Sequence, residues 1–171
     1  MVKHLWLPVA ALLLAIGLAA TAFAGAIAIG IAGIVVVSPL LAPLVLAGGL
    51  LVPAYNLELA GGRFHSDTWF ALAWGGFPAF TGYFVNALTI RPTGLLVTGA
   101  CCLLSAAQRQ LSTPVRRLRR NTTEVIGQQH LRDGSVIELT RAGLSAPLDG
   151  ALRALSLAVV LLAIALVVAH T

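Results

Sequence analysis

A long uncharged segment near the N-terminal end constrains this chain more than any other feature. No Asp, Glu, Lys or Arg occurs between Leu5 and Leu57. A helix that crosses the hydrocarbon core of a bilayer needs about 20 apolar residues, so this segment is long enough for two. A soluble helix keeps a polar stripe in water, and this segment offers none. The sequence therefore predicts an integral membrane protein folded as an all-α polytopic bundle.

Composition supports the same fold class. Hydrophobic residues make up 58% of the 171 positions and charged residues only 10%, whereas soluble domains carry about 25% charged residues. At this length, a membrane region of that composition leaves no room for a separate folded soluble domain.

Turn and cap signals divide the apolar sequence into five expected membrane helices. Within the uncharged segment the break is predicted at Val37-Ser38-Pro39, because Ser at the N-cap followed by Pro is a helix-start pattern. A tight turn at Arg91-Pro92 separates the third and fourth helices. The expected spans are 5–34, 38–54, 68–88 and 93–110, which form a four-helix region over 1–111, and a C-terminal helix over 150–171.

The basic residues predict the orientation of these helices. Eight of the eleven Lys and Arg residues lie between Arg109 and Arg153, and the positive-inside rule places such a loop, 112–149, in the cytoplasm. Counting from this loop puts the N-terminus inside, Arg91 outside and the C-terminus outside. We therefore expect a multi-pass protein of the cytoplasmic (inner) membrane.

The basic loop has two further features. Residues 124–139 contain two short apolar stretches separated by Asp133-Gly134, a pattern that predicts a β-hairpin. The loop carries no aromatic residue to stack on bases and includes four acidic residues, so nucleic-acid binding is not expected.

Aromatic residues are concentrated in one part of the chain. Both Tyr, five of the six Phe and two of the three Trp lie between Tyr55 and Phe84. In the same window, Gly75-Gly76-Phe77-Pro78 is expected to loosen the third helix. Two interpretations remain open: an aromatic belt with a packed kink, or an aromatic-lined pocket for an apolar or cationic ligand that opens to the cytoplasm.

A polar cluster is expected at the cytoplasmic mouth of this region. A solvated loop with a few ion pairs is one interpretation. The other is a divalent metal site formed by Glu58, His65 and Asp67, although their spacing is not diagnostic. The cluster consists of Tyr55, Asn56, Glu58, Arg63, His65 and Asp67.

Three segments carry a resemblance to a known family. The segment 55–63 (YNLELAGGR), followed by 71–78 (ALAWGGFP) and Gly82-Tyr83, resembles the UbiA superfamily of membrane prenyltransferases. The chain is similar to a degenerate C-terminal part of that family, with its spans matching helices three to seven of a nine-helix bundle. The resemblance implies that Tyr55 and Arg63 face a prenyl diphosphate at the cytoplasmic side.

The chain departs from this family at the metal site. UbiA-type enzymes hold Mg²⁺ with two aspartate-rich motifs, of which the first would precede Met1. The second should fall at the cytoplasmic end of the fourth span, but 105–117 contains no carboxylate. No cofactor is therefore expected, and Mg²⁺ only if the aspartate-rich motif is supplied elsewhere. Arginines of this region can bind a phosphate directly.

The sequence favours a non-catalytic protein that binds an isoprenoid or another anionic lipid without Mg²⁺-dependent prenyl transfer. An enzymatic activity, if present, would be prenyltransferase-like. One alternative is a membrane subunit that docks a membrane-protein partner, or forms an oligomer, through the 112–149 loop. The other is a small membrane metalloenzyme using Glu58, His65 and Asp67. The candidate ligand-binding residues are Tyr55, Asn56, Glu58, Arg63, Trp74, Tyr83, Arg109, Arg116 and Arg117.

Overall fold

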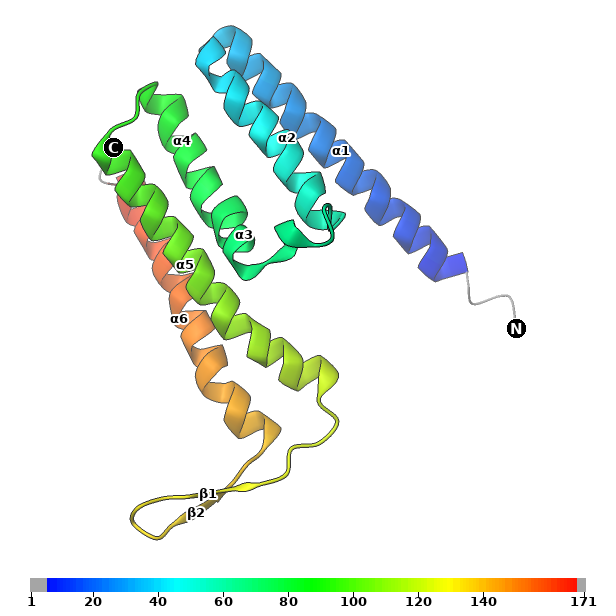
Figure 1. The fold of residues 1–171 in the computed structure, drawn as a ribbon, viewed down its shortest axis with the longest axis vertical. Coiled ribbons are helices and arrows are strands. Elements are labelled where there is room, and N and C mark those ends of the chain that lie inside the picture. The colour runs from blue at the N-terminus through cyan, green and yellow to red at the C-terminus, as the bar shows by residue number, and fades with distance from the viewer. Residues whose placement is uncertain (1–5, 169–171) are drawn as a thin grey trace. The chain divides into compact units, whose positions relative to one another are not determined.

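The structure, a computed structural model, describes residues 6–168 and is mostly helical (Figure 1). The predicted positions of the two chain ends refer to residues outside this range. The elements are α1 (Trp6–Val36), η1 (Pro39–Leu41), α2 (Ala42–Asn56), η2 (Arg63–His65), α3 (Asp67–Ala71), η3 (Leu72–Gly76), α4 (Phe77–Ala87), α5 (Pro92–Arg116), η4 (Arg117–Asn121), β1 (Gln128–His130), β2 (Val136–Glu138) and α6 (Arg141–Val168).

Three helices are long and apolar enough to cross a membrane. They are Trp6–Val36, Pro39–Asn56 and Arg141–Val168. The expected spans 68–88 and 93–110 are helical too, but within the described residues they are not among these three. The fold class is thus confirmed as helical with a small two-stranded sheet, and three helices are consistent with a membrane protein.

The chain divides into two compact units, which we describe one at a time. Unit 1 comprises the described residues through Ser66 together with Phe77–Thr98. Unit 2 comprises Asp67–Gly76 and the described residues from Gly99 onward.

In unit 1, the turn between α1 and α2 is formed as the sequence predicts. Ser38 is extended at the N-cap of η1, and its Oγ accepts a hydrogen bond from the Leu40 N–H at 3.2 Å. Pro39 follows at the first helical position, where it loses no helical hydrogen bond. The predicted break at 37–39 is confirmed.

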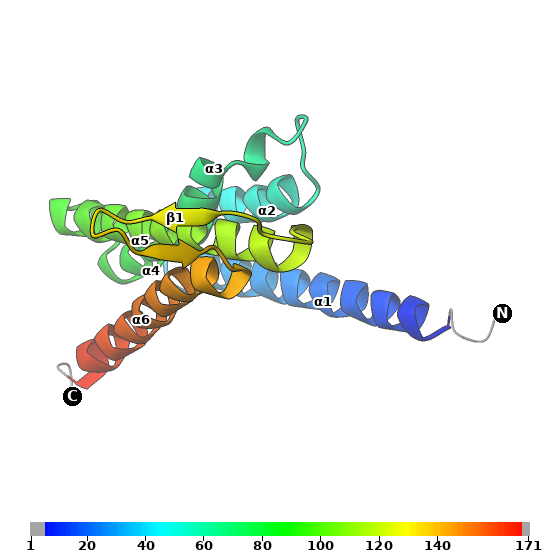
Figure 2. The same ribbon diagram turned by 90° about the horizontal axis from the view of Figure 1, so that it is seen from below.

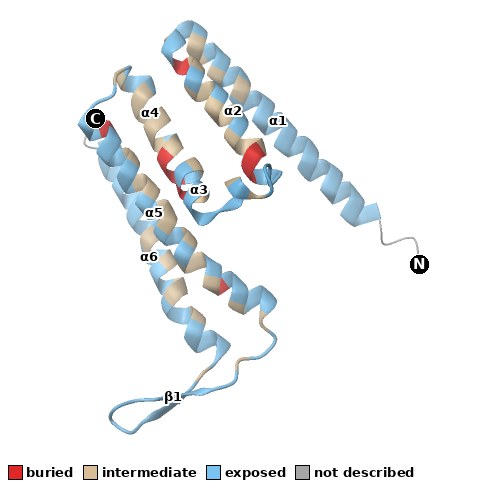
Figure 3. Ribbon diagram, viewed as in Figure 1, coloured by how far each residue is buried: buried red, intermediate tan, exposed pale blue. Residues whose placement is uncertain are grey.

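Glycines let α2 approach α1 in unit 1. A Cβ added at Gly30 would lie 2.9 Å from both Val45 methyl groups, closer than real Cβ atoms approach. The small core of this unit includes Leu41, on η1. None of the residues of α1, all of them described, is buried (Figure 3).

The segment between α3 and α4 stays helical but changes its hydrogen-bond pattern. Leu72–Gly76 is a π-helix directly before Phe77-Pro78. Pro78 has no N–H to donate to the carbonyl four residues earlier, which disrupts the α-helical ladder there. The irregularity predicted at Gly75–Pro78 is confirmed, as a π-helical segment.

In unit 2, helices occupy much of the segment that we expected to be a loop. α5 continues to Arg116 and η4 to Asn121, and α6 begins at Arg141. The connection without helix is therefore 122–140 rather than 112–149. The expected end of the span at residue 110 was wrong: Val115, beyond it, is buried, and tertiary packing of this kind outweighs local propensity.

The early start of α6 also has a local cause. Thr140 Oγ1 accepts a hydrogen bond from the Gly143 N–H at 3.0 Å, which is the geometry of a helix N-cap. The Arg141 guanidinium donates from Nη2 to the carbonyl oxygens of Thr122 and Thr123, at 2.6 and 2.7 Å. These contacts fix the two ends of the 122–140 connection to each other.

The predicted hairpin is present, with shorter strands than 124–139 (Figure 2). β1 and β2 are antiparallel, and His130 is paired with Val136. The Gly134 N–H donates to the Leu131 carbonyl at 3.1 Å, with Gly134 at φ +83°, as in three-residue hairpin turns. The Asp133 carboxylate accepts hydrogen bonds from the hydroxyl and from the backbone N–H of Ser135. Both bonds lower the pKa of Asp133, and the hydroxyl has the larger effect.

Candidate ligand-binding site

Unit 1 contains an apolar cavity of about 440 Å³, within the usual size range of small-molecule sites. Its wall is formed by α1 from Phe23 onward, by the turn and α2 as far as Val52, and by one face of α4. The α4 residues in the wall are Phe77, Thr81 and Val85, spaced four residues apart. Thr81 contributes the one polar side chain among the lining residues.

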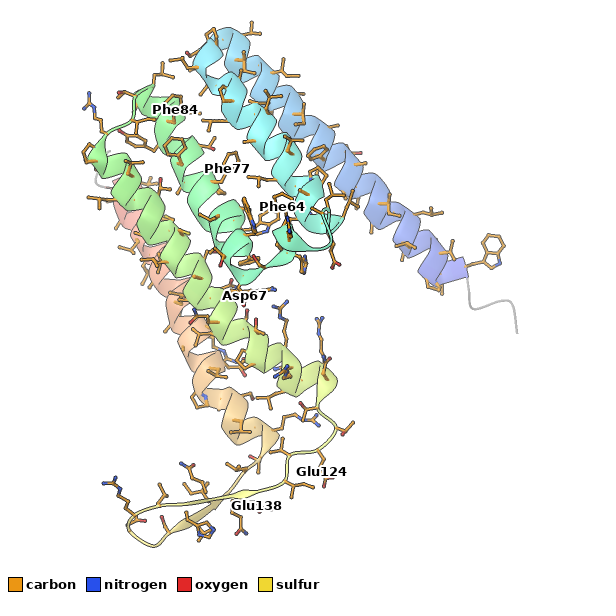
Figure 4. The ribbon with its side chains drawn as sticks, in the orientation of Figure 1. Phe64, Asp67, Phe77, Phe84, Glu124 and Glu138 are labelled. Atoms are coloured by element: carbon orange, nitrogen blue, oxygen red, sulfur yellow. The ribbon has the colours of Figure 1, made fainter. Side chains whose placement is uncertain are left out.

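Glycines on two consecutive helices leave room for this cavity. Gly30 and Gly33 on α1, and Gly48 and Gly49 on α2, all line it. A Cβ added at Gly48 would lie 3.2 Å from Cε1 of Phe77, whose side chain lies between α4 and α2 (Figure 4). The cavity was not predicted from the sequence, although these four glycines were a signal for it.

Two hydroxyl groups on α4 are buried without a hydrogen-bond partner among the described residues. They are Thr81 Oγ1 and Tyr83 Oη. A hydroxyl left unpaired in apolar surroundings costs about 1–3 kcal/mol. Only Thr81 lines the cavity. Tyr83 instead packs its ring against Gly94, where any Cβ would collide with it.

The cavity of unit 1 is not the aromatic-lined pocket that the sequence offered as one interpretation. Of the aromatic window 55–84, only Phe77 contributes an aromatic ring to the cavity wall. Trp74 lies on the π-helical segment of unit 2, where 45% of its surface is exposed.

At the end of α2, two of the predicted polar residues come together. The rings of Tyr55 and His65 stack with their centroids 4.6 Å apart, and His65 Nδ1 lies 3.3 Å from the Tyr55 carbonyl oxygen. Asn56 instead donates from Nδ2 to the Val52 carbonyl of its own helix at 2.8 Å. Glu58 and Arg63 are exposed in the following turn, and Glu58 has a left-handed φ of 50°.

In unit 2, two other predicted residues bind each other. Arg109 Nε lies 2.8 Å from Asp67 Oδ1, and its guanidinium carbon lies 5.0 Å from the centroid of the Phe70 ring. Only 16% of the Arg109 side chain is exposed. Arg109 is thus a structural residue rather than an arginine available to a phosphate. Asp67 is labelled in Figure 4.

The alternative interpretation of Glu58, His65 and Asp67 as a metal site finds no support in the structure. Among residues 6–168, no three His, Cys, Asp or Glu side chains are grouped so that they could hold a metal ion. Asp67 is paired with Arg109 and His65 is stacked on Tyr55, so these local interactions take the place of metal coordination.

Three arginines, one at the end of α5 and two on η4, remain available to an anionic partner. Arg116, Arg117 and Arg120, here called the arginine group, are exposed and form no ion pair within the described part of the chain. Their neighbour Arg119 is paired with Asp149 at 2.8 Å. The arginine group therefore keeps its charge exposed for an anionic partner.

Unit 2 has a smaller cavity of about 260 Å³ between α3 with η3 and α5. Asp67 and Gln110 contribute polar groups to its wall, and Cys102 lies there beside Leu103 and Ala106. It is less apolar than the cavity of unit 1 and only about half its size.

No protein-family model, curated protein or solved structure matches this chain. The resemblance to the UbiA superfamily stays a prediction that rests on the segments in which it was seen. What the structure adds is the cavity of unit 1.

Proposed function

We propose that this chain is a multi-pass protein of the cytoplasmic membrane that binds an isoprenoid or another lipid, with the apolar part of the ligand in the cavity of unit 1. The cavity carries the proposal. Its lining residues include no charged side chain, and a charged group placed there would lose its hydration without compensation. An apolar chain carries no such hydration to lose.

The arginine group supports the membrane part of the proposal. Arginines close to an anionic bilayer surface each contribute about 1 kcal/mol of attraction, and the arginine group is unpaired and exposed. We place it on the cytoplasmic side by the positive-inside rule. The proposal includes no prenyl transfer, because 105–117 offers no carboxylate to hold Mg²⁺.

Filling the cavity tests this function. Gly33 lines it, and an added Cβ meets Leu41 only at an ordinary contact distance of 3.5 Å. Gly33→Leu should therefore keep the fold while its side chain occupies the cavity. We expect labelling by an alkyl-diazirine hydrocarbon in reconstituted vesicles to fall about tenfold, which corresponds to about 1.4 kcal/mol.

Gly17→Leu is the matched control. Gly17 lies on the same helix, does not line the cavity and has no neighbouring atom within 4 Å of an added Cβ. Its labelling should equal that of the wild type. Equal labelling of Gly33→Leu and Gly17→Leu, mapped by mass spectrometry to the α2 and α4 wall, contradicts the proposed function.

A second candidate function is docking of a membrane-protein partner through the hairpin. The sheet has only two strands within the described residues, so both outer edges are unpaired, and such edges are templates for another strand. Ile126 is 84% exposed, and Val136 and Ile137 are each 50% exposed. Figure 4 labels Glu138, on β2, and Glu124, in the connection that leads to β1.

Replacing 125–139 with a Gly-Ser linker tests docking without disturbing the helices. The replacement keeps the Thr140 cap and the Arg141 contacts to the Thr122 and Thr123 carbonyls. If the hairpin docks a partner, proteins that co-purify with the wild type should be lost while membrane insertion is unchanged. Co-purification that survives the replacement removes this candidate.

A further inference from the structure

The arginine group lies on the outer surface of its helix. Val115, the residue before it, is only 4% exposed, and Leu118 is half-buried, so the opposite face packs inward. Arg116 and Arg120 are four positions apart, and Arg117 and Arg120 are three apart. Side chains at these spacings are neighbours on a helix surface. The three exposed guanidinium groups are therefore presented together.

No acidic residue forms an ion pair with the arginine group within the described part of the chain. The segment 105–123 contains no Asp or Glu, and the two ion pairs of unit 2 involve Arg109 and Arg119 instead. Like charges at three- and four-residue spacing destabilise a helix. A bound anion would remove this repulsion, and an anion with more than one negative charge would remove more of it.

The ion pair between Arg119 and Asp149 fixes the depth of the arginine group relative to α6. It joins η4 to a helix that is long and apolar enough to cross a membrane. The uncharged part of α6 begins at Ala154, which lies about 8 Å from Asp149 along the helix axis. The headgroup layer on each side of the hydrocarbon core is about 5–8 Å thick. With α6 as a crossing helix, Asp149 and the adjoining arginine group lie at the level of the lipid headgroups.

We propose that the arginine group binds the headgroup of a membrane lipid that ends in a phosphomonoester. The inference rests on the membrane placement in the proposed function and does not involve the cavity of unit 1. A phosphomonoester carries about −1.5 to −2 charges at pH 7 and has three terminal oxygens that accept hydrogen bonds, whereas a phosphodiester headgroup has less charge and fewer such oxygens. The guanidinium fork of arginine binds oxygens of this kind bidentately.

Native mass spectrometry of the full-length protein tests this preference. The protein is reconstituted in phosphatidylcholine vesicles that contain phosphatidic acid, a phosphomonoester, and phosphatidylglycerol, a phosphodiester, at equal mole fractions and with identical acyl chains. The lipids that remain bound after mild detergent extraction are then counted. We expect phosphatidic acid to be enriched about tenfold over phosphatidylglycerol, the ratio expected from one further hydrogen bond between charged groups.

Variants assign the enrichment to the arginine group. Arg116→Gln, Arg117→Gln and Arg120→Gln combined should bring the two lipids to equal amounts. The triple variant should stay folded, because it removes like charges from exposed positions. Arg117→Gln alone should lower the enrichment in part. Its matched control is Arg132→Gln, which removes one exposed arginine at the hairpin turn, outside the arginine group, and should keep the enrichment of the wild type.

Three results would overturn the inference. The first is equal amounts of the two lipids on the wild type, which is also the result expected if the arginine group pairs with an acidic protein segment. The second is an enrichment that persists in the triple variant. The third is an enrichment that inorganic phosphate abolishes and chloride of equal ionic strength does not, since the site would then take free phosphate rather than a lipid headgroup.

Gly33→Leu keeps the failures of the two proposals distinguishable. This variant should lower the total amount of bound lipid and leave the ratio of phosphatidic acid to phosphatidylglycerol unchanged. Total bound lipid equal to that of the wild type contradicts the proposed function and not the inference. A ratio that falls to one in Gly33→Leu assigns the preference to the cavity and overturns the inference.

Discussion

Gly75 is the residue on which the packing of the π-helical segment in unit 2 most depends. A Cβ there would lie 2.6 Å from the Cys101 carbonyl oxygen and 2.6 Å from Ser105 Cβ. Real Cβ atoms do not approach a backbone oxygen so closely, so any side chain would push η3 away from α5. The close approach of these two elements requires glycine at this position.

Substitution of Gly75 should therefore destabilise the protein. We expect Gly75→Ala to cost about 1–3 kcal/mol through overpacking and to lower the midpoint of thermal unfolding in detergent. Gly82→Ala is the matched control, because Gly82 is helical and has nothing within 4 Å of an added Cβ. Alanine there should leave the midpoint unchanged or raise it slightly. Equal midpoints for the two variants would show that the close contact has no energetic importance.

Also at the residue scale, the predicted ligand-binding residues and the structure agree only in part. Tyr55 and His65 come together, and so do Asp67 and Arg109. The first two residues stack their rings on each other, and the other two form an ion pair. Residue type indicated which side chains are capable of binding. Residue type did not show that Arg109 forms an ion pair with Asp67, because that contact joins residues forty-two positions apart.

Among the elements, those decided by neighbouring residues were predicted best. Ser38-Pro39 ends one helix and starts the next, Gly75–Pro78 changes the helical pattern, and Asp133-Gly134 forms the hairpin turn. Each depends on caps, missing N–H groups or left-handed backbone that the local sequence specifies.

Element boundaries that depend on distant contacts were predicted poorly. α5 passes through Pro114 to Arg116, and α6 starts at Arg141 rather than near residue 150. Burial of Val115 and the contact of Arg141 with Thr122 lie behind these boundaries, and neither can be read from hydropathy. The cavity of unit 1 was missed for the same reason, since three separate elements form its wall.

At the scale of the whole molecule, the number of membrane crossings decides where each connection lies. If only Trp6–Val36, Pro39–Asn56 and Arg141–Val168 cross, everything from 57 to 140 is on one side. If the helices at 67–87 and 92–116 cross as well, only the turn around Ile90 changes side. Both arrangements place the hairpin on the same side as the arginine group, because no membrane crossing lies between α5 and α6.

The most direct test of the account is the side of the membrane on which Gln128 and Ile90 lie. Single cysteines are introduced as Gln128→Cys and Ile90→Cys in a chain whose Cys101 and Cys102 are replaced by Ala. Intact and permeabilised cells are then treated with an impermeant maleimide. We predict that position 90 is labelled in intact cells and position 128 only after permeabilisation. Labelling of position 128 in intact cells would contradict the cytoplasmic placement of the arginine group, and a position 90 that reacts only after permeabilisation would contradict the five-helix topology.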